Sequence, residues 1–271
     1  MQHDHPDFQW LNQIRFGIIS KAGGEAKLLE QFPVLVRDAI EYVIDPVRTA
    51  RTTIAELDNV EKTFVGLKIE HFIRDFLDVP KGVRDLVIDG EDVDVKNTVG
   101  VTWMIPRETY NVEGPCLLIC IADAKGRCWL GLILAREAYL GAPNQDKKRG
   151  VSAFGRKNIL WLADGVPFAR NHWAGLNMDR FRELRSMDPG AVRAATFFQE
   201  NLNKRVHRNV IQSLLWDQAD YMKRLRENGG ARDILRPLGI ILLGGRFGSQ
   251  EASQLGLAPI GRDEMMAVRT R

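Results

Sequence analysis

The chain has 271 residues, 45% of them hydrophobic, which is enough for one large domain or two modest ones with buried cores. Its formal charge of +3 is too small to indicate a nucleic-acid partner on its own. No segment approaches the roughly 18 consecutive apolar residues of a membrane span, and the polar N-terminus lacks the apolar stretch of a secretory signal. We therefore expect a cytoplasmic protein with no membrane partner.

Charge is distributed unevenly along the chain. Residues 165–271 hold 17 Lys and Arg against 11 Asp and Glu, whereas residues 1–164 hold 21 against 24. Such asymmetry suggests a basic binding half joined to a half that is rich in metal-binding acids. Gly165 and Pro167, residue types that commonly punctuate domains, lie where the balance changes. We therefore predict one domain over residues 1–164 and a second over residues 165–271.

The first part of the chain predicts helices. Apolar spacing of three to four residues indicates helical structure over most of residues 7–45 and again over residues 61–76. Glu70 lies among the apolar residues of the second stretch. It is either a solvated or ion-paired helix carboxylate, or an acid that reaches a metal site from a helix packed under the strands that follow.

Residues 85–97 predict a β-hairpin with an Asp-Gly pair at its turn. In its second strand, period-two alternation places Asp94 and Lys96 on one face. An acid and a lysine two residues apart, with Asp85 about nine residues earlier, form the pattern of PD-(D/E)xK nucleases. Carboxylates supply the hard oxygen ligands of Mg²⁺, and a lysine nearby can offset charge at a phosphate. The Asp-x-Lys tripeptide alone favours a solvated hairpin face, and the additional acids upstream favour an active site.

Two further strands are predicted over residues 116–122 and 128–135, which gives a mixed sheet backed by helices. The three cysteines lie in these runs, and we expect small core side chains rather than disulfides. Residues 103–106, Trp-Met-Ile-Pro, form either a buried loop anchor or part of a DNA-facing wall. The polar loop of residues 144–150 is either a solvated turn or a phosphate contact made by Lys147, Lys148 and Arg149.

The basic half predicts a helix over residues 191–205 and then a helix-turn-helix followed by a strand. The two helices span residues 209–215 and 220–226, and the strand spans residues 239–243. This is the outline of a winged helix-turn-helix, whose second helix enters the major groove. A helix pair with a solvated basic face fits the pattern as well. In the winged-helix interpretation, the DNA contacts are Lys223, Arg224 and Arg226, with Arg205 and Arg208 on nearby phosphates.

These patterns together resemble the NaeI family of type II restriction endonucleases. The matching blocks keep their order from about residue 44 to residue 257. They comprise Glu61-Lys62-Thr63, Gly66, Glu70, Asp85, Val93-Asp94-Val95-Lys96, Trp103-Met104-Ile105-Pro106, Leu140-Gly141, Lys148-Arg149, Gly155-Arg156, Tyr221-Met222-Lys223-Arg224, Gly230-Ala231-Arg232-Asp233-Ile234-Leu235-Arg236-Pro237 and Gly239-Ile240-Ile241-Leu242-Leu243-Gly244.

The resemblance implies an α/β fold, with a mixed-sheet PD-(D/E)xK core followed by a mainly helical winged-helix domain. It places the catalytic acids at Glu70, Asp85 and Asp94, where they would hold Mg²⁺, and the catalytic lysine at Lys96, where it would orient or activate water. The second domain would bind a further copy of the recognition site and stimulate cleavage. A palindromic site in double-stranded DNA implies a homodimer, because a two-fold protein matches a two-fold site.

Two other functions stay open at this stage. A strand-nicking repair nuclease of the same superfamily would act as a monomer or under a partner's control. A winged-helix DNA-binding protein with a vestigial nuclease half would bind DNA without metal-dependent cleavage. The intact set of Glu70, Asp85, Asp94 and Lys96 argues against the vestigial alternative.

Overall fold

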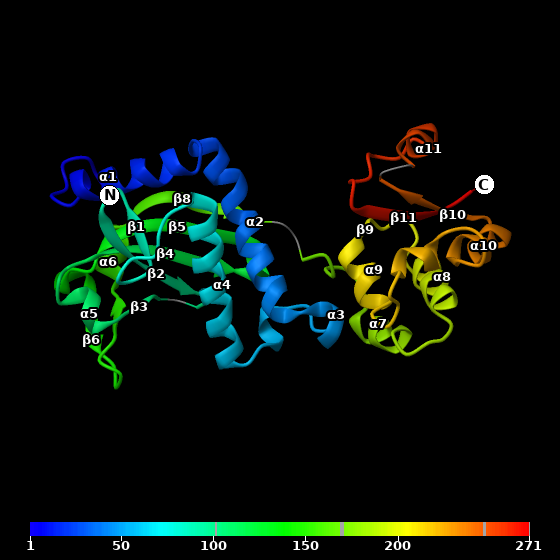
Figure 1. The fold of residues 1–271 in the computed structure, drawn as a ribbon, viewed down its shortest axis with the longest axis horizontal. Helices are drawn as coiled ribbons and strands as arrows, with labels where there is room; N and C mark the ends of the chain where they lie inside the picture. Colours follow the sequence, from blue (N-terminus) through cyan, green and yellow to red (C-terminus); the bar gives the residue numbers. More distant parts are fainter. Residues whose placement is uncertain (101, 169–170, 246–247, 271) are drawn as a thin grey trace. The chain divides into compact units, whose positions relative to one another are not determined.

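The structure, a computed structural model, describes residues 1–100, 102–168, 171–245 and 248–270. The chain forms two compact units (Figure 1). The first contains Met1–Ile44 and Thr53–Ala169, and the second contains Asp45–Thr52 and Arg170–Arg271. None of the described helices is both long and apolar enough to cross a membrane.

A five-stranded mixed sheet forms the centre of the first unit. Its order is β1-β2-β4-β5-β8, in which β2 and β4 run parallel and the other neighbours antiparallel. The mixed sheet and the two central strands predicted from the sequence are therefore confirmed. The strands are β1 (Leu86–Ile88), β2 (Glu91–Thr98), β4 (Pro115–Ala122), β5 (Arg127–Leu134) and β8 (Leu160–Pro167).

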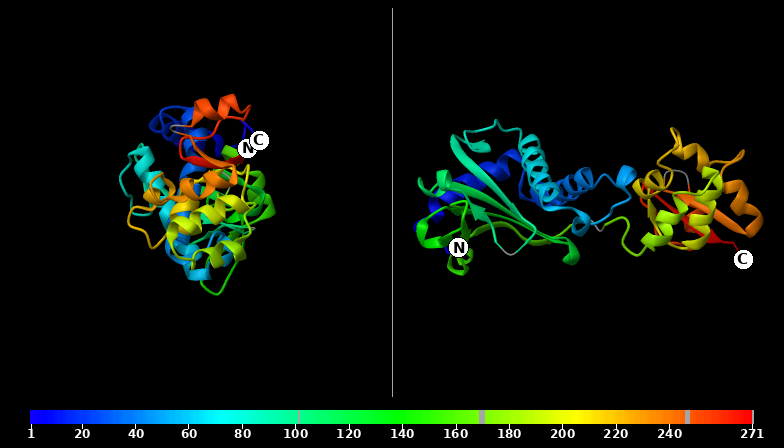
Figure 2. Two further views of the ribbon diagram at one scale, coloured as in Figure 1. Left: turned by 90° about the vertical axis from the view of Figure 1, so that its right-hand side faces the viewer. Right: turned by 90° about the horizontal axis from the view of Figure 1, so that it is seen from below.

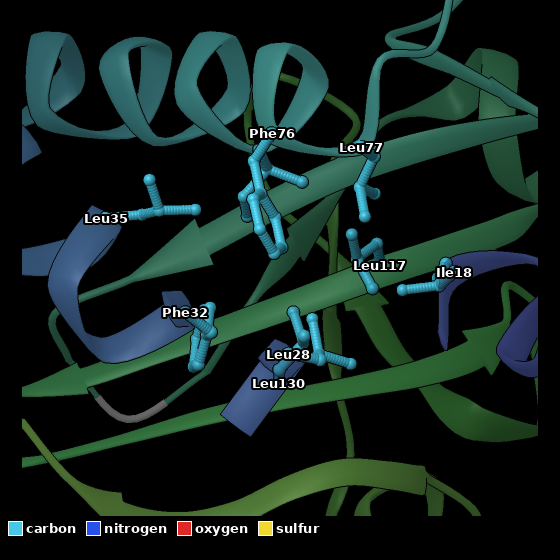
Figure 3. Close-up of a pocket in the computed structure, with 9 residues that line it drawn as sticks. Ile18, Leu28, Phe32, Leu35, Phe76, Leu77, Leu117 and Leu130 are labelled. Carbon is cyan, nitrogen blue, oxygen red and sulfur yellow. The ribbon is translucent and has the colours of Figure 1, made fainter. Parts of the chain in front are cut away.

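Three long helices cover one face of this sheet (Figure 2). A capping box starts the third of them, because the Asp58 carboxylate accepts a hydrogen bond from the Glu61 amide at 2.8 Å and the Glu61 carboxylate accepts one from the Asp58 amide at 3.0 Å. Figure 3 shows apolar side chains of these helices converging on Leu117 and Leu130 of the sheet. The helical segments on this side are α1 (Phe8–Lys21), α2 (Glu25–Ile44), η1 (Ile54–Glu56) and α4 (Asn59–Leu77).

A smaller sheet covers the other face. Its order is β3-β7-β6, and its apolar residues form a core with Cys116 and Leu118 of β4. Trp103 is buried in this core and its Nε1 donates to the Ile119 carbonyl at 2.7 Å, which favours the anchor interpretation of residues 103–106. The elements on this side are β3 (Met104–Ile105), α5 (Arg107–Tyr110), η3 (Glu137–Tyr139), β6 (Leu140–Pro143), β7 (Arg149–Val151) and α6 (Ala153–Lys157). A short 3-10 helix, η2 (Asp123–Lys125), connects β4 to β5.

The second unit packs short helices against a three-stranded antiparallel sheet of order β10-β11-β9. Its core includes Phe181, Phe197, Leu214 and Leu242. The described elements are α3 (Pro46–Thr49), α7 (Met178–Leu184), α8 (Gly190–Glu200), β9 (Val206–His207), α9 (Arg208–Leu214), η4 (Tyr221–Leu225), α10 (Ala231–Leu235), η5 (Arg236–Leu238), β10 (Ile240–Gly244), α11 (Ser249–Gln254) and β11 (Glu264–Arg269).

The boundary expected between residues 164 and 165 falls inside β8, which continues to Pro167. The pairing of β5 with β8 shifts register here. Leu130 pairs with Ala163 and Cys128 pairs with Val166, so β8 has one more residue than β5 between these two pairs. Gly165 has a φ of +64° at this irregularity. The glycine that suggested a linker therefore serves a β-bulge.

Residues 45–52 pack with the second unit, although they lie far from it in the sequence. The Arg185 guanidinium donates to the carbonyls of Pro46 at 3.2 Å and Val47 at 2.8 Å. Ser213 Oγ donates to the Pro46 carbonyl at 2.6 Å. These backbone contacts carry no signature in the local sequence, so the sequence predicts this segment to belong to the first domain.

The helix predicted over residues 220–226 is also wrong in type. The structure has a five-residue 3-10 helix, η4, in which Leu225 is the only fully buried side chain. One buried side chain cannot provide the apolar stripe that stabilises an amphipathic helix. Asn228 and Gly229, both with positive φ, then turn the chain into α10.

Asp7 fastens the N-terminal segment to the first unit and yields a stability prediction. Its buried carboxylate accepts hydrogen bonds from Arg136 Nε at 2.8 Å and from the Tyr139 hydroxyl at 2.7 Å. Burial opposes ionisation, but the hydrogen bonds from Arg136 and Tyr139 hold the pKa of Asp7 below its usual value.

We expect Asp7→Asn to lower the free energy of unfolding by about 1–3 kcal/mol at pH 7. Because the folded pKa lies below the unfolded value of about 3.9, this contribution is present above about pH 4 and is lost as the pH falls through the folded pKa. Urea unfolding of the wild type and of Asp7→Asn at pH 7 and below pH 4 measures the difference in unfolding free energy and its loss at low pH. Asp4→Asn, at an exposed position, is the matched control and should match the wild type. An equal deficit of Asp7→Asn at both pH values would contradict the assigned charge.

Candidate active site

The β1–β2 hairpin brings three of the four predicted catalytic residues together, namely Asp85, Asp94 and Lys96. Asp89 and Gly90 both have positive φ, +50° and +92°, as a type I′ turn requires. Leu86 pairs with Val93, so one further step of the antiparallel register sets Asp85 opposite Asp94. Residues opposite one another in an antiparallel pair point to the same face. The turn and the register therefore place both carboxylates on one side of the sheet.

The side chains of Asp85, Asp94 and Lys96 contact one another or shared neighbours. Lys96 Nζ forms an ion pair with Asp94 and lies 3.7 Å from Asp85 Oδ2. The Val95 amide donates to Asp85 Oδ2 at 2.6 Å. Thr109, which sequence reasoning missed, donates its hydroxyl to Asp94 Oδ2 at 2.5 Å. These contacts form a compact cluster of two acids and one lysine.

The electrostatics of this cluster are dominated by two neighbouring carboxyl groups, one of them buried. Asp94 is 3% exposed. Burial and the neighbouring Asp85 carboxyl raise the pKa of Asp94, while Lys96 and the Thr109 hydroxyl oppose that rise. Two carboxylates that repel one another in a partly dehydrated site are stabilised by added positive charge, and Lys96 supplies part of it.

Glu70 lies on α4, which packs against the opposite face of β2 through Val95 and its neighbours. Its carboxylate is 3.6 Å from Arg74 Nη1, as in the ion-paired interpretation. Within the described ranges, no group of three or more His, Cys, Asp and Glu side chains is arranged to hold a metal ion. The structure therefore gathers Asp85, Asp94 and Lys96 but does not add Glu70 to them.

The basic loop between β6 and β7 belongs to the small sheet that covers the Asp94 face. Cys116 and Leu118, the register partners of Asp94 and Lys96, contribute to the core under this sheet. The loop residues differ in their environments. Lys147 and Lys148 are exposed, whereas Arg149 pairs with Glu137 at 2.8 Å and lies over the Tyr110 ring.

The second unit contains a cleft lined by arginines from four segments. Arg208 and Arg226 were predicted from the sequence, while Arg232 of α10 and Arg262 before β11 were not assigned there to DNA binding. Acidic residues also line the cleft, so its charge is mixed. The acidic residues of the lining are Glu227, Glu251, Asp263 and Glu264. The other predicted DNA contacts, Arg205, Lys223 and Arg224, are exposed. Arg224 Nε donates to Gln218 Oε1 at 2.6 Å.

Two acids and a lysine on adjoining strands of a mixed sheet are typical of the PD-(D/E)xK class of nucleases. A family model described as "Restriction endonuclease NaeI" matches residues 29–271. The chain is also 31% identical over 245 residues to "Type II restriction enzyme NaeI" of Lentzea aerocolonigenes, which covers 87% of this chain and 76% of the relative. The chain belongs to the NaeI family of restriction endonucleases, and it is a type II restriction enzyme.

Gly66 controls how closely α4 approaches β2. A Cβ at this position would lie 2.3 Å from Asn97 Oδ1 and 2.6 Å from Asn97 Cγ. Glu70 lies one helical turn further along the same face of α4. The absent side chain of Gly66 therefore helps to set the distance between Glu70 and β2.

We expect Gly66→Ala to destabilise the fold, because overpacking costs about 1–3 kcal/mol and the better helix propensity of alanine returns up to about 1 kcal/mol. Replacing Asn97 by Ala in the same chain should recover much of the loss, and a double-mutant cycle of unfolding free energies measures this coupling. Additive effects of the two substitutions would show that Asn97 does not limit the approach of α4.

Proposed function

We propose that the first unit hydrolyses double-stranded DNA at a short palindromic site with Mg²⁺ as cofactor. The observation that carries this proposal is the cluster of Asp85, Asp94 and Lys96 on one face of the central sheet. The family supplies the reaction class, since members are restriction endonucleases. The cluster supplies the residue types that such a reaction needs.

The donor set of the cluster fits Mg²⁺, which prefers carboxylate oxygens and keeps several waters. Asp85 and Asp94 would hold the ion, and Glu70 would be a further ligand, either direct or through water. When bound, Mg²⁺ would lower the pKa of water and offset charge on the scissile phosphate. Lys96 would orient the attacking water and stabilise the negative charge that develops on the phosphate. Because Glu70 pairs with Arg74 and is not grouped with the cluster, it would have to leave Arg74 and move towards Asp85 and Asp94 to act as a direct ligand.

The substrate symmetry leads us to propose a homodimer. A palindromic site presents the same sequence to each protomer, so two copies related by a two-fold axis would each place one catalytic cluster at one strand. Lys147, Lys148 and Arg149 would contribute phosphate contacts from the loop above the catalytic face. Such contacts add affinity that depends on salt but carry no sequence information.

The second unit is proposed to be a winged-helix domain that binds a further DNA site and stimulates cleavage. Support comes from the order α8, β9, α9, α10, β10, β11 and from the sheet order β10-β11-β9, which are typical of winged helices. In this arrangement α10 takes the place that the sequence gave to residues 220–226. Arg232 then joins Arg208 and Arg226 as a candidate DNA contact, because all three line one cleft.

Plasmid cleavage tests the catalytic assignment. We expect wild-type protein with Mg²⁺ to cut plasmid DNA that carries many sites into discrete fragments, and we expect no cleavage in EDTA. Lys96→Ala should be slower by about 100-fold or more, because a charge-stabilising group is removed from the reacting phosphate. Lys125→Ala, at an exposed turn of the same sheet, is the matched control and should retain wild-type activity. Nicked circles alone would favour a repair nuclease, and a gel shift without cleavage would contradict the enzymatic proposal.

The stimulation of cleavage tests the second unit. With a plasmid that carries one site, we expect an added site-bearing duplex to raise the wild-type cleavage rate. Arg232→Ala should bring the ratio of stimulated to basal rate towards one, because the cleft loses a phosphate-binding charge. Arg269→Ala, at an exposed position of β11, is the control. A wild-type ratio in Arg232→Ala would argue against the cleft as the effector site.

A further inference from the structure

A hydrogen bond between two buried side chains holds one oxygen of the central acid. Asp94 and Thr109 are 3% and 0% exposed, and the Thr109 hydroxyl donates to Asp94 Oδ2 at 2.5 Å. The other oxygen, Oδ1, faces the Lys96 ammonium. The two oxygens of one carboxylate therefore have different roles, because one contacts the protein interior and the other contacts the catalytic lysine.

The position of Thr109 is fixed on both sides of the residue. Thr109 lies in α5, whose first turn is closed by hydrogen bonds from the Thr109 and Tyr110 amides to the Pro106 carbonyl at 3.1 and 3.2 Å. The Thr109 carbonyl accepts from the Gly114 amide at 3.0 Å. Gly114 directly precedes β4, whose Cys116 is the register partner of Asp94. The hydroxyl is thus presented to Asp94 by the helix α5, which is hydrogen-bonded to the residue directly before β4.

The next residue connects the same helix to the basic loop. The Tyr110 hydroxyl donates to the Lys147 carbonyl at 3.0 Å, and the Arg149 guanidinium lies 5.3 Å from the Tyr110 ring centroid. Adjacent residues of a four-residue helix therefore contact the central acid and the loop that carries the exposed lysines. These contacts connect α5 both to Asp94 and to the β6–β7 loop.

We propose that Thr109 is a positioning residue that fixes the carboxylate plane of Asp94 for metal binding. The terminal torsion of an aspartate is broad, so one ion pair to a flexible lysine does not define the carboxylate plane. A second donor on the opposite oxygen removes that freedom. Groups that orient metal ligands in this way typically change metal affinity by about 10–100-fold when they are removed. This inference rests on the proposed role of Asp94 as a metal ligand.

The test compares two substitutions that separate the hydroxyl from the shape of the side chain. Thr109→Val keeps the branched shape and deletes the donor, whereas Thr109→Ser keeps the donor. Binding of Mn²⁺ to the full chain without DNA, measured by electron paramagnetic resonance of the free ion, is independent of cleavage. We expect Thr109→Val to weaken Mn²⁺ binding by about 10–100-fold and Thr109→Ser to stay near the wild type. The Mg²⁺ concentration for half-maximal cleavage should shift in parallel.

Controls separate positioning from a loss of folding. Thr102→Val removes a hydroxyl that donates to the carbonyl of Val151 in β7 at 2.8 Å. This substitution should leave the Mn²⁺ affinity unchanged. Wild-type Mn²⁺ affinity in Thr109→Val, with only a lower unfolding midpoint, would overturn the positioning role while leaving the metal site intact. Wild-type Mn²⁺ affinity in Asp94→Ala would instead overturn the metal assignment, and this inference would fail with it.

Discussion

The register of the β1–β2 hairpin is the constraint on which the proposed catalytic site depends. A slip of one residue would turn every side chain of β2 to the other face, and Asp94 and Lys96 would then point into the helical core. The Arg84 amide and guanidinium hold the register, since both donate to the Asp92 carboxylate at 3.1 Å. Val93 and Val95, packed against the helices, impose the same register from the opposite side. One pairing therefore determines which residues form the core and which form the site.

Burial of Asp94 has a cost in stability that the surrounding structure partly offsets. A charged carboxylate without partners in the interior would be strongly destabilising. Lys96 and Thr109 supply donors, yet the pKa of Asp94 stays raised because burial and Asp85 outweigh them. Added positive charge, such as that of the proposed Mg²⁺, would offset this cost. The stability of the sheet would then depend on the ion that the proposed chemistry needs.

The second unit uses charge differently from the first. Among its described arginines, some hold the structure together and others line the cleft. Arg193 is 2% exposed and pairs with Asp217 at 2.7 Å, and Arg185 binds the carbonyls of residues 46 and 47. Arg208, Arg226 and Arg232 instead line the cleft. A count of basic residues in this half overestimates the charge available to a DNA partner, because buried arginines are already paired.

The sequence by itself determined the hairpin, the strands near residues 116 and 128 and the helix that carries Glu70, because local periodicity and turn chemistry encode them. It also indicated the family, through the resemblance of ordered sequence blocks to those of known members. Only the tertiary structure decided that Thr109 contacts Asp94, that residues 45–52 join the second unit and that Gly165 serves a bulge. The tertiary structure also brought Arg208, Arg226, Arg232 and Arg262 to the lining of one cleft. These features depend on contacts between segments far apart in the chain, and the packing of the folded protein selects such contacts without leaving a local pattern.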